Sequence, residues 1–419
     1  MIRARALSSA VVVVICVVSL LTASAAQGKS SVGVDKSFGK KGVANLTAIR
    51  GDGIALAQVP GGTLVGVGES VVRVDSSGSQ DSSFGTSGVA TVPEGVRSVS
   101  AYTSGPLAGR FLPYSGPASS VFRYAAEGQL DTSFPELRFV DGSNGPYFFG
   151  APIAYPAGPT EKFLMSRSEP APGFGTQAIR IERRNADGSL DTSFATGGTF
   201  TSDVGLQSFD PIPYPSSSKQ AGKVLIPVGQ PSLYLRVTAD GQLDKSFGRG
   251  GVLRVKNGVG RFAAFYPNGE MLFSGFAPVG ADLPDATTLS RLTDDGKLDK
   301  RFGQNGTAKL VTQQGENGYE YASPARLALI TTGRHKGQIV GAGEAASIRI
   351  RSGELGGRSN VAIFAFTEDG QLDKGFGRGG ALTRVPGVKL QPEPQMLASE
   401  RGALIAYQNK GVPQLLRFK

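Results

Sequence analysis

The side chains with the most evident chemical potential in this chain are arginines and aspartates that recur at fixed spacing. An arginine stands 11 residues before a phenylalanine in five places, and a sixth takes the matching place near the C-terminus: Arg73, Arg123, Arg183, Arg236, Arg291 and Arg417. Six aspartates each stand three residues before a phenylalanine: Asp81, Asp131, Asp191, Asp244, Asp299 and Asp373. Guanidinium groups gathered around one opening would bind an anion, so these arginines are the candidate ligand-binding residues. Alternatively, each arginine pairs with its own aspartate or with backbone carbonyls, and repetition in nearly every unit favours that structural role.

The sequence contains few of the residues that catalytic and metal sites commonly use. An Asp-Gly-x-Leu-Asp pair suggests calcium, but a calcium site needs six to eight oxygens, and one such pair supplies too few. Cys16 is the only cysteine and His335 the only histidine. His335 stands in a predicted turn, so we expect it to be exposed to solvent rather than to act as a base. We therefore predict no metal, no cofactor and no catalytic triad, and a carboxylate pair remains the one open route to an enzyme.

These charged residues belong to a motif, D-G-x-L-D-x-x-F-G-x-x-G, that occurs seven times in recognisable form. The phenylalanines of the copies are Phe38, Phe84, Phe134, Phe194, Phe247, Phe302 and Phe376. A period of about 50 to 60 residues indicates one supersecondary unit that is repeated, as in propellers and solenoids. Each unit is named below by its phenylalanine.

Each unit contains short apolar strands separated by turns rich in glycine. In the motif, Asp-Gly predicts a turn, and the second aspartate is expected to accept hydrogen bonds from the N–H groups that follow it. The leucine is predicted to pack into the core and the phenylalanine against the next unit. The glycines after it are expected to adopt positive φ and lead into the next strand.

The two ends of the chain complement each other. Residues 415–418 match the arginine strand of the other units, whereas the mature N-terminus begins at the Asp35–Phe38 part that the C-terminus lacks. An open solenoid would carry polar caps instead. The sequence therefore predicts an all-β fold, a seven-bladed β-propeller closed by pairing of the N- and C-terminal strands in one blade.

The N-terminus resembles an export signal peptide. Arg3 and Arg5 precede an apolar run, and Ala23-Ser24-Ala25 offers a cleavage site. We expect a signal peptide at residues 1–25, a short lead at 26–32 and the propeller at 33–419. The alternative is an uncleaved anchor, because residues 7–26 could span a bilayer. With the signal cleaved, the protein would be secreted or extracytoplasmic, at the cell surface or outside it, with no membrane span.

The net charge is +10, and removal of Arg3 and Arg5 with the signal leaves +8. Such a charge favours an anionic polysaccharide or an envelope polymer as partner, and a protein partner is the alternative. The charge is spread along the chain, however, which is also consistent with a role in solubility alone. The chain has no Trp and no basic-aromatic stripe, so we do not expect it to bind nucleic acid.

The motif resembles that of the delta-60 repeat β-propellers, exported bacterial repeat proteins, over residues 33–419. The Phe194, Phe247, Phe302 and Phe376 copies match most fully, although Ala195 replaces the glycine after Phe194. In the Phe134 copy, Pro135 replaces the same glycine. The resemblance implies a secreted or surface-associated propeller and brings no catalytic residues.

Segments outside the repeat are the better candidates for recognition. The Phe376 unit is the longest and holds Tyr319-Glu320-Tyr321, Arg349, Arg351 and Arg358, and the Phe194 unit holds Tyr147-Phe148-Phe149 and Tyr155. We expect a monomeric, non-catalytic binding or scaffold module, with exposed aromatic side chains that contact a saccharide or a protein. The alternative is an extracellular glycan-active hydrolase or lyase with a carboxylate pair at the channel mouth.

Overall fold

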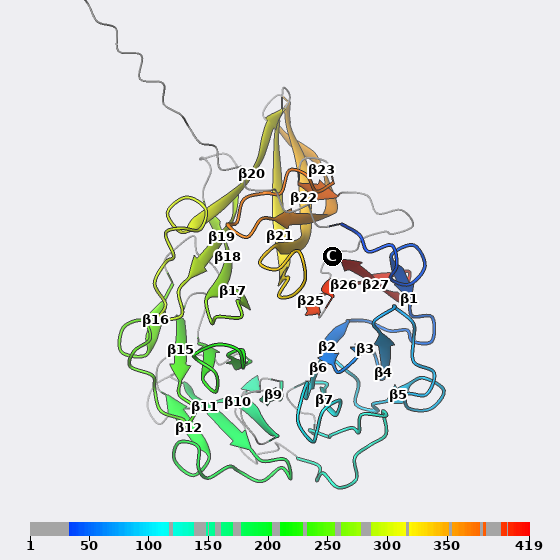
Figure 1. The fold of residues 1–419 in the computed structure, drawn as a ribbon, viewed down its shortest axis with the longest axis vertical. Helices are drawn as coiled ribbons and strands as arrows, with labels where there is room; N and C mark the ends of the chain where they lie inside the picture. The colour runs from blue at the N-terminus through cyan, green and yellow to red at the C-terminus, as the bar shows by residue number, and fades with distance from the viewer. Residues whose placement is uncertain are drawn as a thin grey trace, which may run out of the picture.

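The described elements are all β-strands, and they form sheets arranged around a central axis as in a β-propeller (Figure 1). The computed structural model describes residues 33–116, 120–137, 148–149, 151–155, 161–170, 177–202, 210–228, 233–255, 261–277, 286–315, 318–351, 354–377, 380–382, 395–399 and 401–419. The predicted signal peptide (1–25) and lead (26–32) lie outside these residues.

The first sheets follow one another along the chain. The Phe84 unit forms β2 (Ala55–Val59), β3 (Gly62–Val67), β4 (Ser70–Asp75) and β5 (Ala90–Thr91). The Phe134 unit forms β6 (Ser98–Ala101) and β7 (Phe111–Tyr114). The Phe194 unit forms β8 (Phe148–Phe149), β9 (Ile153–Tyr155), β10 (Lys162–Pro170), β11 (Gln177–Arg184) and β12 (Thr199–Ser202). The Phe247 unit forms β13 (Ile212–Pro213), β14 (Val224–Pro227), β15 (Leu233–Val237) and β16 (Val252–Arg254).

The next two units share one eight-stranded sheet. Its strands, in order, are β17 (Arg261–Phe265), β18 (Met271–Ala277), β19 (Ala286–Leu292), β20 (Thr307–Gly315), β21 (Gly318–Leu329), β22 (Ile339–Arg351), β23 (Glu354–Phe366) and β24 (Ala381–Leu382). The described strands thus form six hydrogen-bonded sheets, not the seven separate ones expected. The reason is β20, which pairs with β19 up to Leu310 and then with β21 from Val311 onward, and so joins two groups of four strands.

The two ends of the chain pair in the last sheet, as the sequence predicts. This sheet contains β25 (Gln395–Ser399), β26 (Gly402–Asn409), β27 (Val412–Phe418) and β1 (Val43–Asn45). Val43 of β1 lies opposite Leu416 of β27, and the Asp35 N–H donates to the Arg417 carbonyl at 2.8 Å. The core lies between sheets: Phe38 and Leu415 of this unit pack with Val65 and Val72 of the Phe84 unit.

The motif builds the corner of each unit largely as predicted. Each motif phenylalanine is buried, and Asp81 accepts a hydrogen bond from the Ser83 N–H at 2.9 Å. Gly85 adopts a φ of +60°, and a Cβ there would lie 2.1 Å from the Val89 carbonyl oxygen, so this corner requires glycine. Ala195 nevertheless adopts a φ of +49° at the corresponding position.

The prediction for the motif leucine is confirmed for two copies and wrong for three. Leu243 and Leu372 are half-buried and pack against core clusters. Leu130 is 49% exposed, and Leu190 and Leu298 are also exposed. These leucines instead cover the second glycine of the corner, because a Cβ on Gly306 would lie 2.3 Å from the Leu298 Cγ. The exposed copies therefore shield backbone at the surface rather than filling the core.

Candidate functional site

Each of the six candidate arginines pairs with the aspartate of its own unit. The Nε atom donates to aspartate Oδ2 at 2.6 to 2.9 Å in every case: Arg73–Asp81, Arg123–Asp131, Arg183–Asp191, Arg236–Asp244, Arg291–Asp299 and Arg417–Asp35. The structural alternative considered for these arginines is therefore confirmed. Binding of an anion by the same arginines stays a prediction.

The same guanidinium also reaches the next unit. Its Nη1 donates to a carbonyl in the glycine turn of the next motif copy, from Arg73 to Ala126 at 2.8 Å and from Arg417 to Ser76 at 2.5 Å. The other four arginines make the equivalent bond. Its plane lies over the phenylalanine of its own unit, with centroid distances of 4.4 to 5.3 Å. We call this set, the arginine with its aspartate and phenylalanine, the joint of a unit.

A backbone bond accompanies the joint. The N–H of the residue after the phenylalanine donates across the boundary, from Gly85 to the Glu127 carbonyl at 2.6 Å and from Gly303 to the Asp369 carbonyl at 2.8 Å. The phenylalanine ring also lies against the next glycine turn, since a Cβ on Gly128 would lie 3.0 Å from Phe84 Cζ. Three contacts thus connect the joint to the neighbouring unit: the guanidinium–carbonyl bond, the phenylalanine ring and the backbone bond.

The joint keeps its aspartates ionised. The Ser83 hydroxyl and then Arg73 hold the pKa of Asp81 at about 2. Burial alone would raise the pKa of Asp131, but Ser133 and Arg123 outweigh it and hold that pKa at about 2. The pKa values of Asp35, Asp191 and Asp244 are lowered by the same kinds of contact. A carboxyl with such a pKa is a poor general acid near neutral pH.

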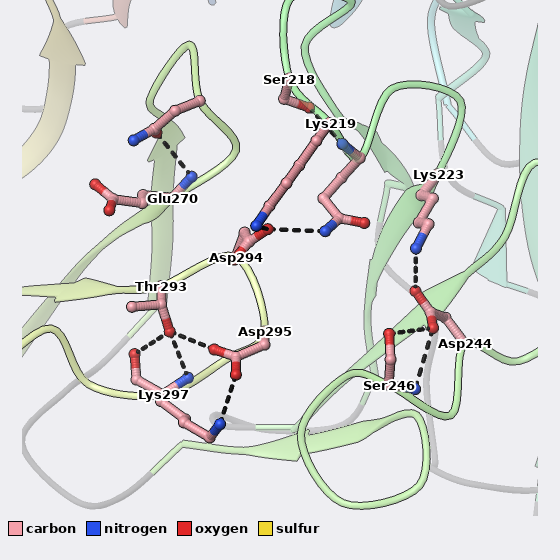
Figure 2. A network of polar contacts seen from close by, with 12 residues as sticks. Ser218, Lys219, Lys223, Asp244, Ser246, Glu270, Thr293, Asp294, Asp295 and Lys297 are labelled. Carbon is pink, nitrogen blue, oxygen red and sulfur yellow. Dashed lines mark hydrogen bonds and ion pairs between the residues drawn. The ribbon is translucent and has the colours of Figure 1, made fainter.

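Several joints carry a second cation that the sequence reading missed. Lys223 Nζ lies 2.7 Å from Asp244 Oδ2, and Figure 2 shows this pair beside Ser246. Arg110 contacts Asp131 and Lys162 contacts Asp191 in the same way, while Lys419 Nζ lies 2.6 Å from Asp35 Oδ1. Arg110, Lys162 and Lys223 share a place at the start of the second strand of their units. These joints carry a local excess of positive charge.

Turns of neighbouring units also contact each other directly. In Figure 2, Lys219 of the Phe247 unit lies 2.9 Å from Asp294 of the Phe302 unit, and the Gln220 amide donates to the same carboxylate at 2.8 Å. The Ser217 hydroxyl donates to the Pro267 carbonyl at 2.9 Å. At this boundary the turns are therefore interlocked rather than independent loops.

The Phe376 unit has no joint arginine. Ala365 occupies the corresponding place, fully buried, and Phe376 packs instead on Phe418 with ring centroids 5.9 Å apart. Asp373 accepts a hydrogen bond from the Gly375 N–H at 3.0 Å. An apolar contact thus replaces the ionic joint at this boundary.

Two expectations for single residues are wrong. His335 is 5% exposed, and its Nδ1 lies 2.8 Å from Gln338 Oε1, because its turn folds back on the strand that follows. Tyr155 is buried at a boundary between units rather than exposed for recognition. Tyr147 lies outside the described residues, while Arg349, Arg351 and Arg358 lie on the long strands β22 and β23.

Asp210 is the one described aspartate whose pKa is raised. It precedes β13, and its Oδ1 accepts a hydrogen bond from the Ala151 N–H at 2.7 Å. The side chain keeps an exposed surface, but the dense protein around it raises the pKa, because desolvation disfavours the charged form. In the described ranges, no three His, Cys, Asp or Glu side chains gather as metal ligands would, and no helix there is long and apolar enough to cross a membrane.

No protein-family model matches the chain, and no curated protein is significantly similar to it. Among solved structures, it is similar to the calcium-binding protein regucalcin from Agrobacterium tumefaciens. The identity is 10% and the TM-score is 0.33, over 89% of this chain and 92% of that chain.

Proposed function

We propose that this chain is an exported, monomeric, seven-bladed propeller of the delta-60 repeat kind that serves as a non-catalytic binding or scaffold module. Its place would be the cell surface or the extracellular space. Its partner would be an anionic polysaccharide or an envelope polymer, or else a protein.

The observation that carries this proposal is that the repeated arginines and aspartates serve as structural contacts. In six units the arginine and the aspartate are engaged with each other and with the neighbouring unit, so the repeat serves to hold the ring together. The seven-blade count rests on the seven motif phenylalanines, each buried at a corner, with the eight-stranded sheet counted as two units.

The Phe376 unit is the favoured location for the partner. Its strands β21, β22 and β23 are 12, 13 and 13 residues long, against 9 or fewer for every other described strand, and they rise to the apex at the top of Figure 1. Extensions that a repeat does not require are where recognition is commonly found. β22 and β23 form a hairpin that pairs from Ile339 opposite Phe366 to Arg351 opposite Glu354.

The test is a binding screen of the full mature chain against anionic and neutral polysaccharides, read by thermal shift at low and moderate salt. The matched variant shortens the hairpin by joining Ala345 to Asn360, which face each other, through a two-residue Asn-Gly turn. We expect one polymer class to stabilise the chain in moderate salt, and the shortened variant to lose that response at an unchanged Tm. Equal responses from both proteins would refute the assignment to this hairpin.

Asp210 is the specific observation that supports the alternative, a glycan-active enzyme. A raised pKa is what a general acid needs, although a glycosidase also needs a second carboxyl roughly 5 to 9.5 Å away. Turnover of a glycan that Asp210→Asn abolishes would establish the enzyme. Binding without turnover, unaffected by Asp210→Asn, would establish the binding module.

A further inference from the structure

One register position recurs at the inner edge of each unit and is filled in different ways. It lies at the end of the innermost strand. The residue opposite it on the second strand stands two residues before the one that faces the joint arginine. Tyr155 thus faces Lys162, Val59 faces Gly62 and Ser399 faces Gly402. In chain order the residues at this position are Val59, Tyr102, Tyr155, Tyr214, Tyr266, Ile330 and Ser399. All are buried or nearly so, Ser399 being the most exposed at 9%.

The tyrosines at this position seal the boundary between units. The Tyr155 ring lies 5.9 Å from the Arg183 guanidinium, and its hydroxyl donates to the Gly222 carbonyl in the next unit. Tyr214 and Tyr266 lie over their own joint arginines at 5.7 and 5.5 Å. The Tyr155 phenol therefore has an arginine on one side and the neighbouring turn at its tip. The Tyr214 hydroxyl instead lies 3.7 Å from Met271 Sδ, and the buried Tyr102 and Tyr266 hydroxyls have no hydrogen-bond partner within the described residues.

The boundary after Ser399 has the same surroundings but no ring. A cavity of about 30 Å³, partly open to solvent, is lined there by Ser399, Arg417, Gly61, Thr63 and Gln58, with Arg401 also contributing. Arg417 takes the place of Arg183. Gly61 precedes the start of the second strand, as Gly222 does. The cavity thus lies at the place that corresponds to the Tyr155 phenol.

The lining offers the contacts that a phenol requires. Gln58 donates its amide N–H to the Gly62 carbonyl at 2.7 Å, but its buried Oε1 accepts no hydrogen bond within the described residues. The Ser399 hydroxyl is engaged with the Gly402 carbonyl at 2.9 Å and does not fill the space. A buried acceptor without a donor is destabilising, so a hydroxyl group that reached it would be favoured.

We propose that this boundary cavity, between β25–β27 and β2–β4, is a binding site for a small phenol. The ring would lie against the Arg417 guanidinium, and the hydroxyl would donate to Gln58 Oε1 or to the Gly61 carbonyl. In its present form the cavity holds one or two waters, so the ring enters from the solvent side and displaces the exposed Arg401 side chain. The proposal rests on the repeat and is independent of the function proposed for the long hairpin.

The experiment titrates the full mature chain with p-cresol, read by ligand-observed NMR and by thermal shift. Ser399→Tyr places a ring in the cavity from within, and Ser399→Ala keeps the cavity open as the matched control. We expect saturable binding to the wild type and to Ser399→Ala, a higher Tm for Ser399→Tyr without ligand, and no binding to Ser399→Tyr. Toluene, which lacks the hydroxyl, is expected to bind roughly threefold to tenfold more weakly. No saturable binding to the wild type, or equal binding to Ser399→Tyr, overturns the proposal.

A reciprocal variant keeps the test decisive if Ser399→Tyr fails to fold. Tyr155→Ser creates the same opening at the boundary between the Phe194 and Phe247 units. We expect it to lower the Tm and p-cresol to restore part of the loss, while toluene restores less. If p-cresol binds neither this variant nor the wild type, a phenol-shaped space does not bind phenols in this ring, and the proposal is wrong.

Discussion

The boundaries of this ring are of two kinds, and the contrast shows how such a ring tolerates change. From the Phe194 to the Phe302 unit, each boundary contains an arginine with a phenylalanine on one side and a tyrosine on the other. On the two sides of the closing sheet, Ala365 replaces an arginine and Ser399 replaces a tyrosine. Phe418 compensates for the first loss through its contact with Phe376, whereas the second leaves a cavity. A polar joint can therefore be exchanged for apolar packing, but the ring missing at Ser399 is not replaced by its neighbours.

The largest effect is expected at the most buried joint. The Arg236 side chain is 1% exposed, so Arg236→Ala leaves Asp244 buried with Lys223 alone and should lower the free energy of unfolding by about 3–5 kcal/mol. Arg73 is 27% exposed and Asp81 25%, so Arg73→Ala should cost only about 1–2 kcal/mol, because water screens the pair. Urea denaturation of both variants measures the difference. Equal losses of unfolding free energy would show that burial does not determine how much a joint contributes to stability.

Backbone crowding in the closing sheet should give the next largest effect. Gly402 has a φ of +126°, and a Cβ there would lie 1.9 Å from the Phe418 carbonyl oxygen. Gly402→Ala should therefore cost about 2–3 kcal/mol. Gly411 has a φ of +75° with open space around it, so Gly411→Ala serves as the control at about 1 kcal/mol. Thermal unfolding that ranks the two variants the other way would contradict the packing of β26 on β27.

Restoring the missing arginine should not help. Ala365 is fully buried among Ile363, Phe376 and Phe418, so Ala365→Arg would overpack an apolar core and lower stability by about 1–3 kcal/mol. Ala365→Val is the smaller apolar control and should cost less. A gain in stability for Ala365→Arg would mean that the new arginine pairs with Asp373. It would also mean that the apolar contact between Phe376 and Phe418 stabilises this boundary less than an ionic joint would.

The smallest effect depends on pH. The pKa of Asp81 is about 2, below the ordinary value of about 3.9, so its contribution to stability is fully present above about pH 4 and is lost as the pH falls to about 2. Arg73→Gln should raise this pKa, and the stability gap between wild type and variant should shrink between pH 4 and pH 2. Carboxyl NMR titration and urea midpoints at each pH measure both quantities. A stability difference between wild type and variant that stays constant down to pH 2 would show that Arg73 does not affect the ionisation of Asp81.

The repeat made the joints predictable, because Arg73, Asp81 and Phe84 recur at constant spacing within one strand and one turn. The tyrosine position was hidden, because the turns between Tyr155 and Lys162 and between Tyr266 and Glu270 differ in length. Only the pairing of strands aligns these tyrosines with Ser399. An absent side chain, moreover, leaves no signal in a sequence.

Other features depended on contacts between segments and could not be inferred from local pattern. The sharing of one sheet by two units follows from β20 continuing past Leu310, where the other described outer strands end after two to four residues. The burial of His335 follows from the fold of its turn. The exposed leucines have the apolar side chains expected of a core, and their glycine partners lie eight residues further along the chain, as Leu298 and Gly306 show.

The pairing of β1 with β27 also bears on how the chain folds. Val43 lies opposite Leu416, so this sheet is completed only by a contact between nearly the two extremes of the sequence. Contacts of such separation are slow to form, because a long loop must close before they contribute any stability. Until this loop closes, Asp35 lacks its ion pair with Arg417. We therefore expect the meeting of the ends to be a late step of folding, and a permuted chain opened between two other sheets to move that slow step to the new opening.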